Sequence, residues 1–175
     1  MRYRSRRVAL VVLPLALALT STACGADQPS TPPELSANYS TVDGEYQQAK
    51  SQLDLPKGMA FPDHLPNTGD HYVPGSGTNQ AQNFWLCAWL RDFLNAPAGD
   101  TARTQQAVGQ LPRYTAMSAY TAGLRPEGRA VVDAAIQGAQ RGEKKQAGVF
   151  VESTCGGPFY SQAGGVPPSG GASHS

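Results

Sequence analysis

A run of apolar and aromatic residues at positions 84–94, broken by two charged residues only, constrains this chain more than any other feature. Its apolar members recur at helical spacing, and two tryptophans widen the stripe. These members are Phe84, Trp85, Leu86, Trp89, Leu90, Phe93 and Leu94. A helix that is apolar around most of its circumference is generally the central helix of its domain. We therefore expect a helical domain built around this segment.

The expected ends of the central helix follow from the residues that flank it. Asn79 and Gln82 have the spacing of a capping box, in which each side chain bonds an amide at the start of a helix. Pro97 and Gly99 are residues that end helices. The sequence therefore predicts a helix that begins at Asn79 and stops before Pro97.

Further helices are expected after the central one. Asp100 or Thr101 is suited to cap a helix that runs to about Leu111, with an apolar face that continues beyond Pro112. Another helix is expected to start near Pro126, because proline fits the first helical turn. It would end at Gly142, and its expected buried stripe is Val131, Val132, Ala135, Ile136 and Ala139.

Residues 143–153 fit two kinds of structure. Val149, Phe150 and Val151 favour a strand, whereas the length and charged start of the segment favour a helix. A strand needs a partner, and the sequence offers no second convincing one. We therefore expect a helix, and the predicted fold class is all-α: a small disulfide-stapled helical bundle over residues 79–155.

Segments with little expected regular structure flank this bundle. Residues 46–78 form a Pro/Gly-rich wrap that starts with a short helix over 46–53 and ends that helix at Pro56. Interspersed apolar residues indicate that the wrap lies against the domain. Residues 156–175 are rich in glycine, serine and proline and are predicted to be a disordered tail.

The first 23 residues have the pattern of a secretory signal peptide. Four arginines precede an apolar run at Val8–Leu19 of 12 residues, interrupted by Pro14. That run is shorter than the roughly 17–25 residues of a membrane-spanning helix. A charged head, a short apolar middle and small residues after it are typical of export signals. Ser5-Arg6-Arg7 also resembles the start of a twin-arginine signal, so the export route stays open.

The segment Ser21-Thr22-Ala23-Cys24 resembles the lipobox of bacterial lipoproteins. The resemblance implies that Cys24 is diacylglycerated and becomes the new N-terminus on the outer face of the cytoplasmic membrane. Residues 24–45 would then be the lipidated cysteine and a flexible tether. Ordinary signal peptidase cleavage after Ala23 fits the small residues too and would give a secreted protein.

The cysteine count bears on this alternative. The chain has three cysteines. In an exported protein an odd number leaves one cysteine without a disulfide partner, and that cysteine needs another role. If Cys24 carries lipid, Cys87 and Cys155 remain as a pair in an oxidising compartment, where a disulfide is expected. A domain of only about 80 residues commonly needs such a cross-link.

The charge of the whole chain combines two different parts. The formal charge is +1, from 14 basic and 13 acidic residues. Removal of residues 1–23 takes away four arginines and no acid, which leaves 10 − 13 = −3. A mildly acidic protein lacks the basic excess of a nucleic-acid binder, so no nucleic acid is expected as a partner.

Few side chains suggest catalytic or metal chemistry. The common hydrolase and metalloprotease motifs are absent from the sequence. Two acid–imidazole pairs, Asp63-His64 and Asp70-His71, are of the types that bind zinc or copper. His64, Asp70 and His71 are therefore candidate metal ligands. Their Pro/Gly-rich surroundings favour solvated loop residues instead, and no cofactor is expected.

Three short motifs carry a family resemblance. Leu55-Pro56-Lys57-Gly58, Tyr72-Val73-Pro74-Gly75 and the Trp-x-Cys-x-Trp at 85–89 resemble small lipoproteins and secreted proteins of actinobacteria. The resemblance covers about residues 54 to 155. It implies an extracytoplasmic location and the disulfide, and it implies no activity.

The function expected from these features is a membrane-anchored binding or interaction module. Its expected partners are the membrane, through lipid on Cys24, and an envelope protein or small ligand. The alternative is an envelope hydrolase or metal-dependent enzyme that uses His64, Asp70 and His71. A structural spacer protein is a third hypothesis.

Overall fold

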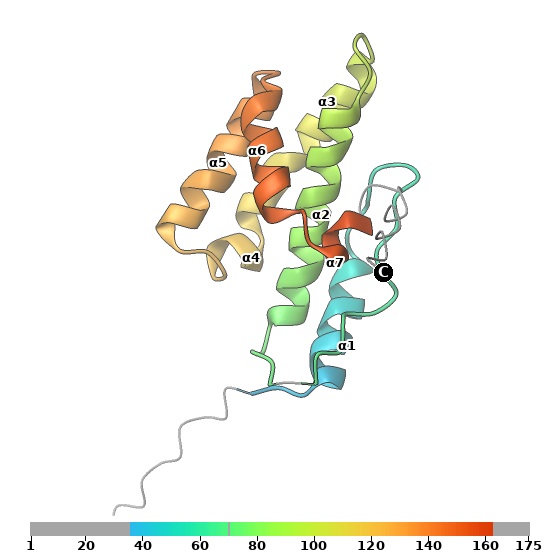
Figure 1. The fold of residues 1–175 in the computed structure, drawn as a ribbon, viewed down its shortest axis with the longest axis vertical. Helices are drawn as coiled ribbons and strands as arrows, with labels where there is room; N and C mark the ends of the chain where they lie inside the picture. Colours follow the sequence, from blue (N-terminus) through green and yellow to red (C-terminus); the bar gives the residue numbers. More distant parts are fainter. Residues whose placement is uncertain (1–35, 70, 163–175) are drawn as a thin grey trace, which may run out of the picture. The chain divides into compact units, whose positions relative to one another are not determined.

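The computed structural model describes residues 36–69 and 71–162, and in this part the chain is all-α. The described residues belong to the second of two units, Pro33–Ser175. They form no extended strand, only one bridge between Ala37 and Tyr72. The helices, coloured along the chain in Figure 1, are α1 (Tyr39–Lys50), α2 (Ser76–Asn95), α3 (Thr101–Gln110), η1 (Leu111–Ala116), α4 (Ser118–Thr121), α5 (Pro126–Gln140), α6 (Lys144–Thr154) and α7 (Pro158–Ser161). The predicted fold class is confirmed.

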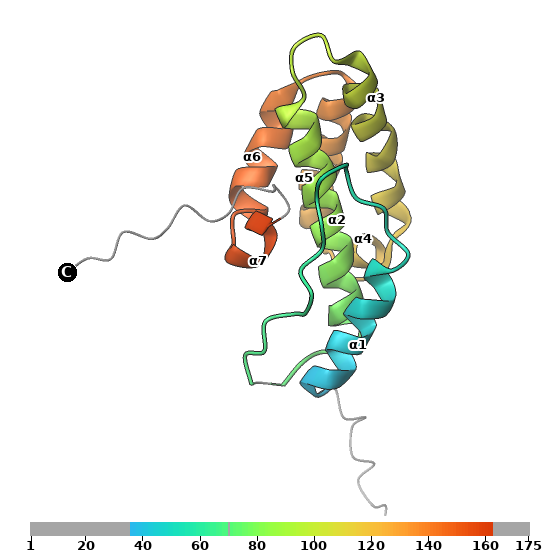
Figure 2. The same cartoon turned by 90° about the vertical axis from the view of Figure 1, so that its right-hand side faces the viewer.

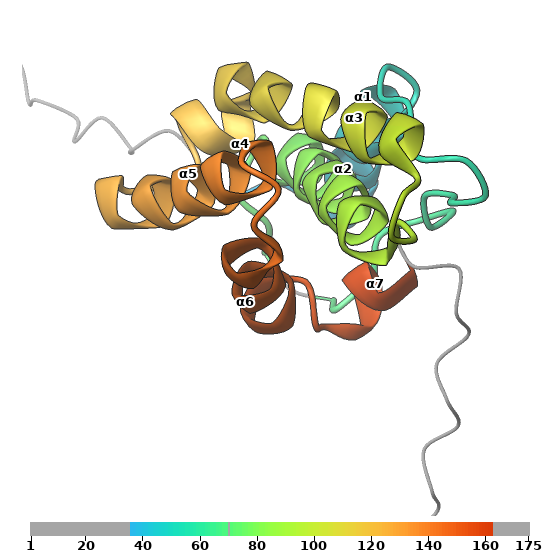
Figure 3. The same ribbon diagram turned by 90° about the horizontal axis from the view of Figure 1, so that it is seen from above.

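Helix α2 is the central helix, as its apolar circumference predicts. Residues 84–90 of α2 are all buried. Helices α1, α3, η1, α4 and α6 pack directly against it, and α5 packs against α6 and α3. Figure 3 looks down on this arrangement, with α3, α5 and α6 set around α2. None of the helices in the described residues has both the length and the hydropathy that crossing a bilayer requires.

The start of α2 differs from the prediction. The N-cap is Gly75, with a φ of 84° that favours glycine, and the helix begins at Ser76 instead of Asn79. The carboxylate of Glu45 on α1 accepts hydrogen bonds from the N–H groups of Gly75 and Gly77, at 2.9 and 3.1 Å. Helix α1 therefore caps α2 through a tertiary contact. Asn79 and Gln82 accept bonds from Ser118 instead.

The later helices follow the sequence closely. The Asp100 side chain caps α3 by accepting from the N–H of Arg103. Helix α5 begins at Pro126, and Gly142, with a φ of 76°, lies in the turn that follows it. The segment at 143–153 is helical, as α6. One residue of the expected buried stripe differs, because Val131 is 54% exposed.

Order extends further at both ends than the sequence predicts. Helix α1 begins at Tyr39 instead of Tyr46, so residues 39–45 are helical and not tether. The Asn38 side chain caps it, and Val42 and Tyr46 are buried against α2. At the other end, α7 places Phe159 and Tyr160 against the core, although a disordered tail was predicted from 156 onward. Cys24 and residues 163–175 lie outside the described residues.

The segment that connects α1 to α2, residues 51–75, is held by side chains that donate to its carbonyl groups. The indole N–H groups of Trp85 and Trp89 both donate to the carbonyl of Asp54, at 2.8 and 3.1 Å. The hydroxyl of Tyr46 donates to the carbonyl of Pro62 at 2.8 Å. Figure 2 shows this connecting segment running along α1 and α2. The expectation that it lies against the domain is confirmed.

The predicted disulfide joins α2 to the residue that follows α6. Cys87 and Cys155 are bonded, with their Cα atoms 5.8 Å apart and 68 positions separating them in the sequence. The guanidinium of Arg91, one helical turn after Cys87, donates to the carbonyls of Cys155 and Tyr160. A covalent bond and an arginine therefore hold the α6–α7 corner to one face of α2.

Candidate functional site

The candidate metal ligands do not assemble into a metal site in the described residues. No group of three or more His, Cys, Asp or Glu side chains suited to hold a metal ion occurs in residues 36–69 and 71–162. Asp70 lies outside these residues. His71 is exposed beside the bridge between Ala37 and Tyr72.

His64 contacts a carboxylate, but that of an acid that the sequence pattern did not indicate. Its Nδ1 lies 2.7 Å from Oδ2 of Asp43 on α1, rather than pairing with the adjacent Asp63. Asp43 is buried and also accepts from the N–H of Leu65 at 2.9 Å. Burial by itself raises the pKa of Asp43, but hydrogen bonds from Leu65, His64 and Gln47 outweigh it and lower this pKa overall.

The pair of Asp43 and His64 lacks part of what a catalytic centre needs, and its role is structural. A carboxylate that orients an imidazole is half of a hydrolytic triad, which also needs a nucleophile at the other ring nitrogen. In the described residues the side-chain contacts of the His64 ring are those with Asp43 and Gln47. The pair therefore fastens the connecting segment to α1.

A cavity beside the disulfide has the character of a ligand site. It has a volume of about 240 Å³ and lies between α2, η1, α5, α6 and α7. Its walls are mostly apolar and include Leu86, Cys87, Leu124, Val132 and Phe150. Ligand pockets generally combine apolar walls with a few polar groups.

Polar groups gather in the lining of this cavity. The hydroxyl of Tyr114 donates to Oδ1 of Asn83 at 2.5 Å, and the hydroxyl of Tyr160 donates to Oε1 of Gln80. Burial raises the pKa of Tyr160, and a hydrogen bond with Asn83 partly opposes that rise. Burial, with a smaller contribution from Tyr160, also raises the pKa of Tyr114. Both phenols are therefore neutral at physiological pH, and the polar groups are uncharged.

A shallower apolar groove of about 340 Å³ adjoins the cavity on α5 and α6. Val131 and Phe150 line both hollows, so these two side chains are shared between them. Val131 and Val149 are 54% and 59% exposed, which places two β-branched side chains on the surface of this groove.

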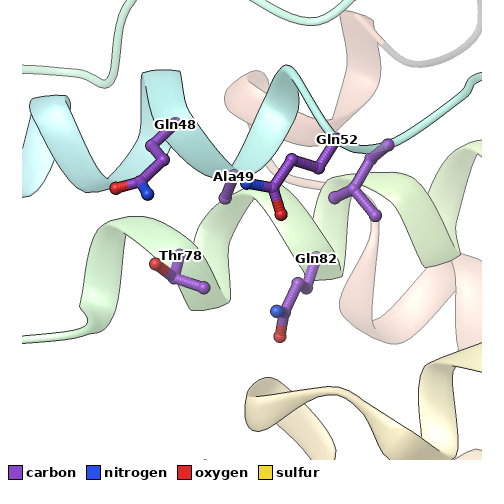
Figure 4. Close-up of a pocket in the computed structure, with 6 residues that line it drawn as sticks. Gln48, Ala49, Gln52, Thr78 and Gln82 are labelled. Carbon is purple, nitrogen blue, oxygen red and sulfur yellow. The ribbon is translucent and has the colours of Figure 1, made fainter.

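A third hollow, of about 300 Å³, lies between α1 and α2, and half of its six lining residues are glutamines. Figure 4 shows Gln48 on α1 across from Thr78 on α2, and Gln52, just after the end of α1, on the side of Gln82. Gln82 also lines it, but its Oε1 accepts bonds from the hydroxyl of Ser118 and the N–H of Ala119. Part of this polar lining therefore joins α2 to α4.

Sequence reasoning missed the polar part of the apolar cavity and the role of Asp43. One signal for the first was available, because Asn83 precedes Cys87 by four residues and must share its helix face. No comparable signal exists for Asp43, whose partner His64 is 21 positions away.

Comparison with known proteins gives no relative: no family model, no curated protein and no solved structure matches this chain.

Proposed function

We propose that this chain is an exported, lipid-anchored protein of the outer face of the cytoplasmic membrane, and that it acts by binding a ligand. The disulfide carries this proposal. Structural disulfides persist in oxidising compartments outside the cytoplasm. With Cys87 bonded to Cys155, Cys24 is the one remaining cysteine of the three, and it stands in the lipobox-like segment.

The hollows of the domain support binding over catalysis. The cavity beside Cys87 has apolar walls and neutral polar groups, which suit the recognition of a ligand. General acid–base chemistry needs titratable groups with a pKa near the working pH, and the titratable groups in the lining of this cavity are Tyr114 and Tyr160, whose pKa burial raises above the ordinary value.

The anchor is tested with Cys24→Ala in the native host. We expect the variant to accumulate as uncleaved precursor or to be released from the membrane, and to lose incorporation of a labelled fatty acid. Ser21→Leu is the matched control, because leucine is usual at that position of the lipobox, and it should stay membrane-bound and labelled. Normal processing and membrane retention of Cys24→Ala would refute the lipid anchor.

The alternative, an envelope hydrolase or metal-dependent enzyme that uses His64, Asp70 and His71, rests on the pair between Asp43 and His64. Calorimetric titration with zinc distinguishes it from the binding module. The alternative requires stoichiometric zinc binding that is lost in the His64→Ala, His71→Ala double variant. Such a result would count against the binding module, whereas absence of stoichiometric heat is the outcome we expect.

A further inference from the structure

We infer that the cavity beside the disulfide takes a small uncharged molecule with an apolar ring or short chain and one hydroxyl group. This inference deepens the proposed function, because it rests on the binding role and names the site and the class of ligand. Size, wall chemistry and hydrogen-bond direction each limit what the cavity accepts.

The size of the cavity sets the size of the ligand. An engineered apolar cavity of about 150 Å³ holds benzene, which has six non-hydrogen atoms. The cavity here has a volume of about 240 Å³. By simple proportion it has room for about ten non-hydrogen atoms.

The walls exclude a charged ligand. The lining consists of apolar side chains, Gly128 and four uncharged polar residues, with no lysine, arginine, aspartate or glutamate. An ion that moved from water into this cavity would lose its hydration without gaining a counter-charge. Apolar contact with Leu86, Val132 and Phe150 instead favours a hydrocarbon body.

The polar residues of the lining limit which hydrogen bonds a ligand can form. Tyr114 uses its only hydroxyl proton in the bond to Oδ1 of Asn83, so its oxygen offers a ligand a lone pair. The side chain of Asn83 is further engaged with Tyr160, which donates to Gln80. An uncharged hydroxyl on a ligand can therefore donate its proton to the Tyr114 oxygen.

The disulfide makes the cavity a preformed one. Cys87 is part of the wall, and its bond to Cys155 fixes the end of α6 against α2. Thr154, next to Cys155, also lines the cavity. A preformed site spends less free energy on ordering when a ligand binds.

The inference is tested with 4-propylphenol, which has about the ten non-hydrogen atoms that the volume allows. The protein is the processed chain, residues 24–175 with Cys24→Ala, which needs no detergent. Titration is followed by NMR of backbone amides and methyl groups. We expect saturable shifts that centre on Leu86, Val132 and Phe150.

Gly128→Leu tests whether the ligand occupies this cavity. Gly128 lines the cavity, and a Cβ there would approach nothing nearer than Leu124 Cδ2 at 3.4 Å, so a larger side chain can extend into the space. The variant should weaken binding at least tenfold. Gly109→Leu on α3 is the matched control, because a Cβ there meets no atom within 4 Å and the residue is not in the lining. It should bind as the parent does.

A second pair of variants tests the hydroxyl contact. Tyr114→Phe should weaken the binding of 4-propylphenol by about threefold to tenfold, which is the usual contribution of one neutral hydrogen bond. The binding of propylbenzene, which has no hydroxyl, should not change. Tyr120→Phe is the control, because the Tyr120 hydroxyl donates to Asp133, outside the cavity.

Three results would overturn the inference. The first is the absence of a saturable shift with 4-propylphenol, and the second is binding of 4-propylphenol to Gly128→Leu as tight as to the parent. The third is binding of propylbenzene to the parent as tight as that of 4-propylphenol. The anchor is measured separately, by membrane release of Cys24→Ala. Failure at the cavity with a functional anchor therefore rejects the ligand class alone, and failure of the anchor with normal phenol binding rejects the lipoprotein half of the proposed function.

Discussion

The two sides of α2 are fastened by different kinds of bond. On one side, a disulfide and Arg91 hold the corner between α6 and α7. On the other side, α1 and the connecting segment at 51–75 contain no cysteine, and side chains that donate to main-chain carbonyls hold them against α2. The first side therefore depends on one strong link, and the second distributes its stability over many weak ones.

The composition of the connecting segment explains this difference. Its four prolines, at 56, 62, 66 and 74, have no N–H group, so the segment contains more hydrogen-bond acceptors than donors. Buried carbonyls need partners. Tyrosine, tryptophan and lysine side chains supply the missing donors, since each projects a polar group from an otherwise apolar body.

The largest predicted effect follows from removing the disulfide. A bridge between residues 68 positions apart contributes about 4 kcal/mol in the chain-entropy model. The Cys87→Ala, Cys155→Ala double variant should lose about that free energy of unfolding, measured by urea denaturation. Cys24→Ala is the control and should lose none. A loss below about 1 kcal/mol would show that the two sides of α2 are fastened equally well without it.

The same double variant gives a local measurement. Hydrogen exchange of the amides of α6 and α7 should accelerate more than that of α1, because only the former lose their covalent link to α2. Equal acceleration on both sides would contradict the comparison.

A close approach of α1 and α2 gives the next largest effect. A Cβ on Gly77 would lie 1.9 Å from the carbonyl oxygen of Val42, a backbone atom that no rotamer change can move. Gly77→Ala should therefore force the two helices apart and cost about 3 kcal/mol. Gly44→Ala on α1 is the matched control, because a Cβ there meets no atom within 4 Å. It should gain up to about 1 kcal/mol from helix propensity. Thermal unfolding followed by circular dichroism measures both, and equal melting temperatures would refute the close contact.

The sequence predicted features that depend on neighbouring residues. The interior of α2, the Asp100 cap of α3, the Pro126 start of α5 and the helix at α6 all follow from local pattern. The predicted start of α2 was wrong because Glu45, whose carboxylate accepts from the first N–H groups of the helix, lies 30 residues earlier on another helix. The cavity was missed for the same reason, since Asn83 and Tyr114 meet across 31 positions. Contacts of this range depend on the tertiary fold and leave no periodic signal.

Asp43 tests whether one buried acid organises the connecting segment. Asp43→Asn removes the charge that accepts from the Leu65 N–H and faces His64, and should cost about 2 kcal/mol in urea denaturation at pH 7. Asp63→Asn is the control, because Asp63 is exposed and contacts other residues through its main-chain carbonyl.

The pH dependence of this effect has a definite sign. Burial raises the pKa of Asp43, but the hydrogen bonds from Leu65, His64 and Gln47 lower it further, to below its ordinary value. A lowered pKa in the folded state stabilises the fold above the ordinary value of about 3.9, and this contribution is lost as the pH falls through the folded pKa. The difference between the parent and Asp43→Asn should therefore shrink below pH 4. A difference that grew in acid would contradict the assigned hydrogen bonds.

The smallest predicted effect tests whether one hydrogen-bond donor to the connecting segment can compensate for the loss of another. The hydroxyl of Tyr46 donates to the carbonyl of Pro62, which also accepts from Nζ of Lys50 at 3.2 Å. Tyr46→Phe keeps the buried ring and leaves that carbonyl one donor, so it should cost about 0.5–1 kcal/mol. Lys50→Met should cost a similar amount.

The double variant separates redundancy from simple addition. With both donors gone, the buried carbonyl of Pro62 is unsatisfied, and the loss should reach about 2–3 kcal/mol, more than the two single losses together. Tyr39→Phe combined with Lys50→Met is the matched control, because Tyr39 donates to a different carbonyl, that of Leu65. Those two losses should add. Coupling in the first pair and additivity in the second would establish that the connecting segment withstands the loss of any one donor, whereas the other side of α2 concentrates its stabilisation in the bond between Cys87 and Cys155.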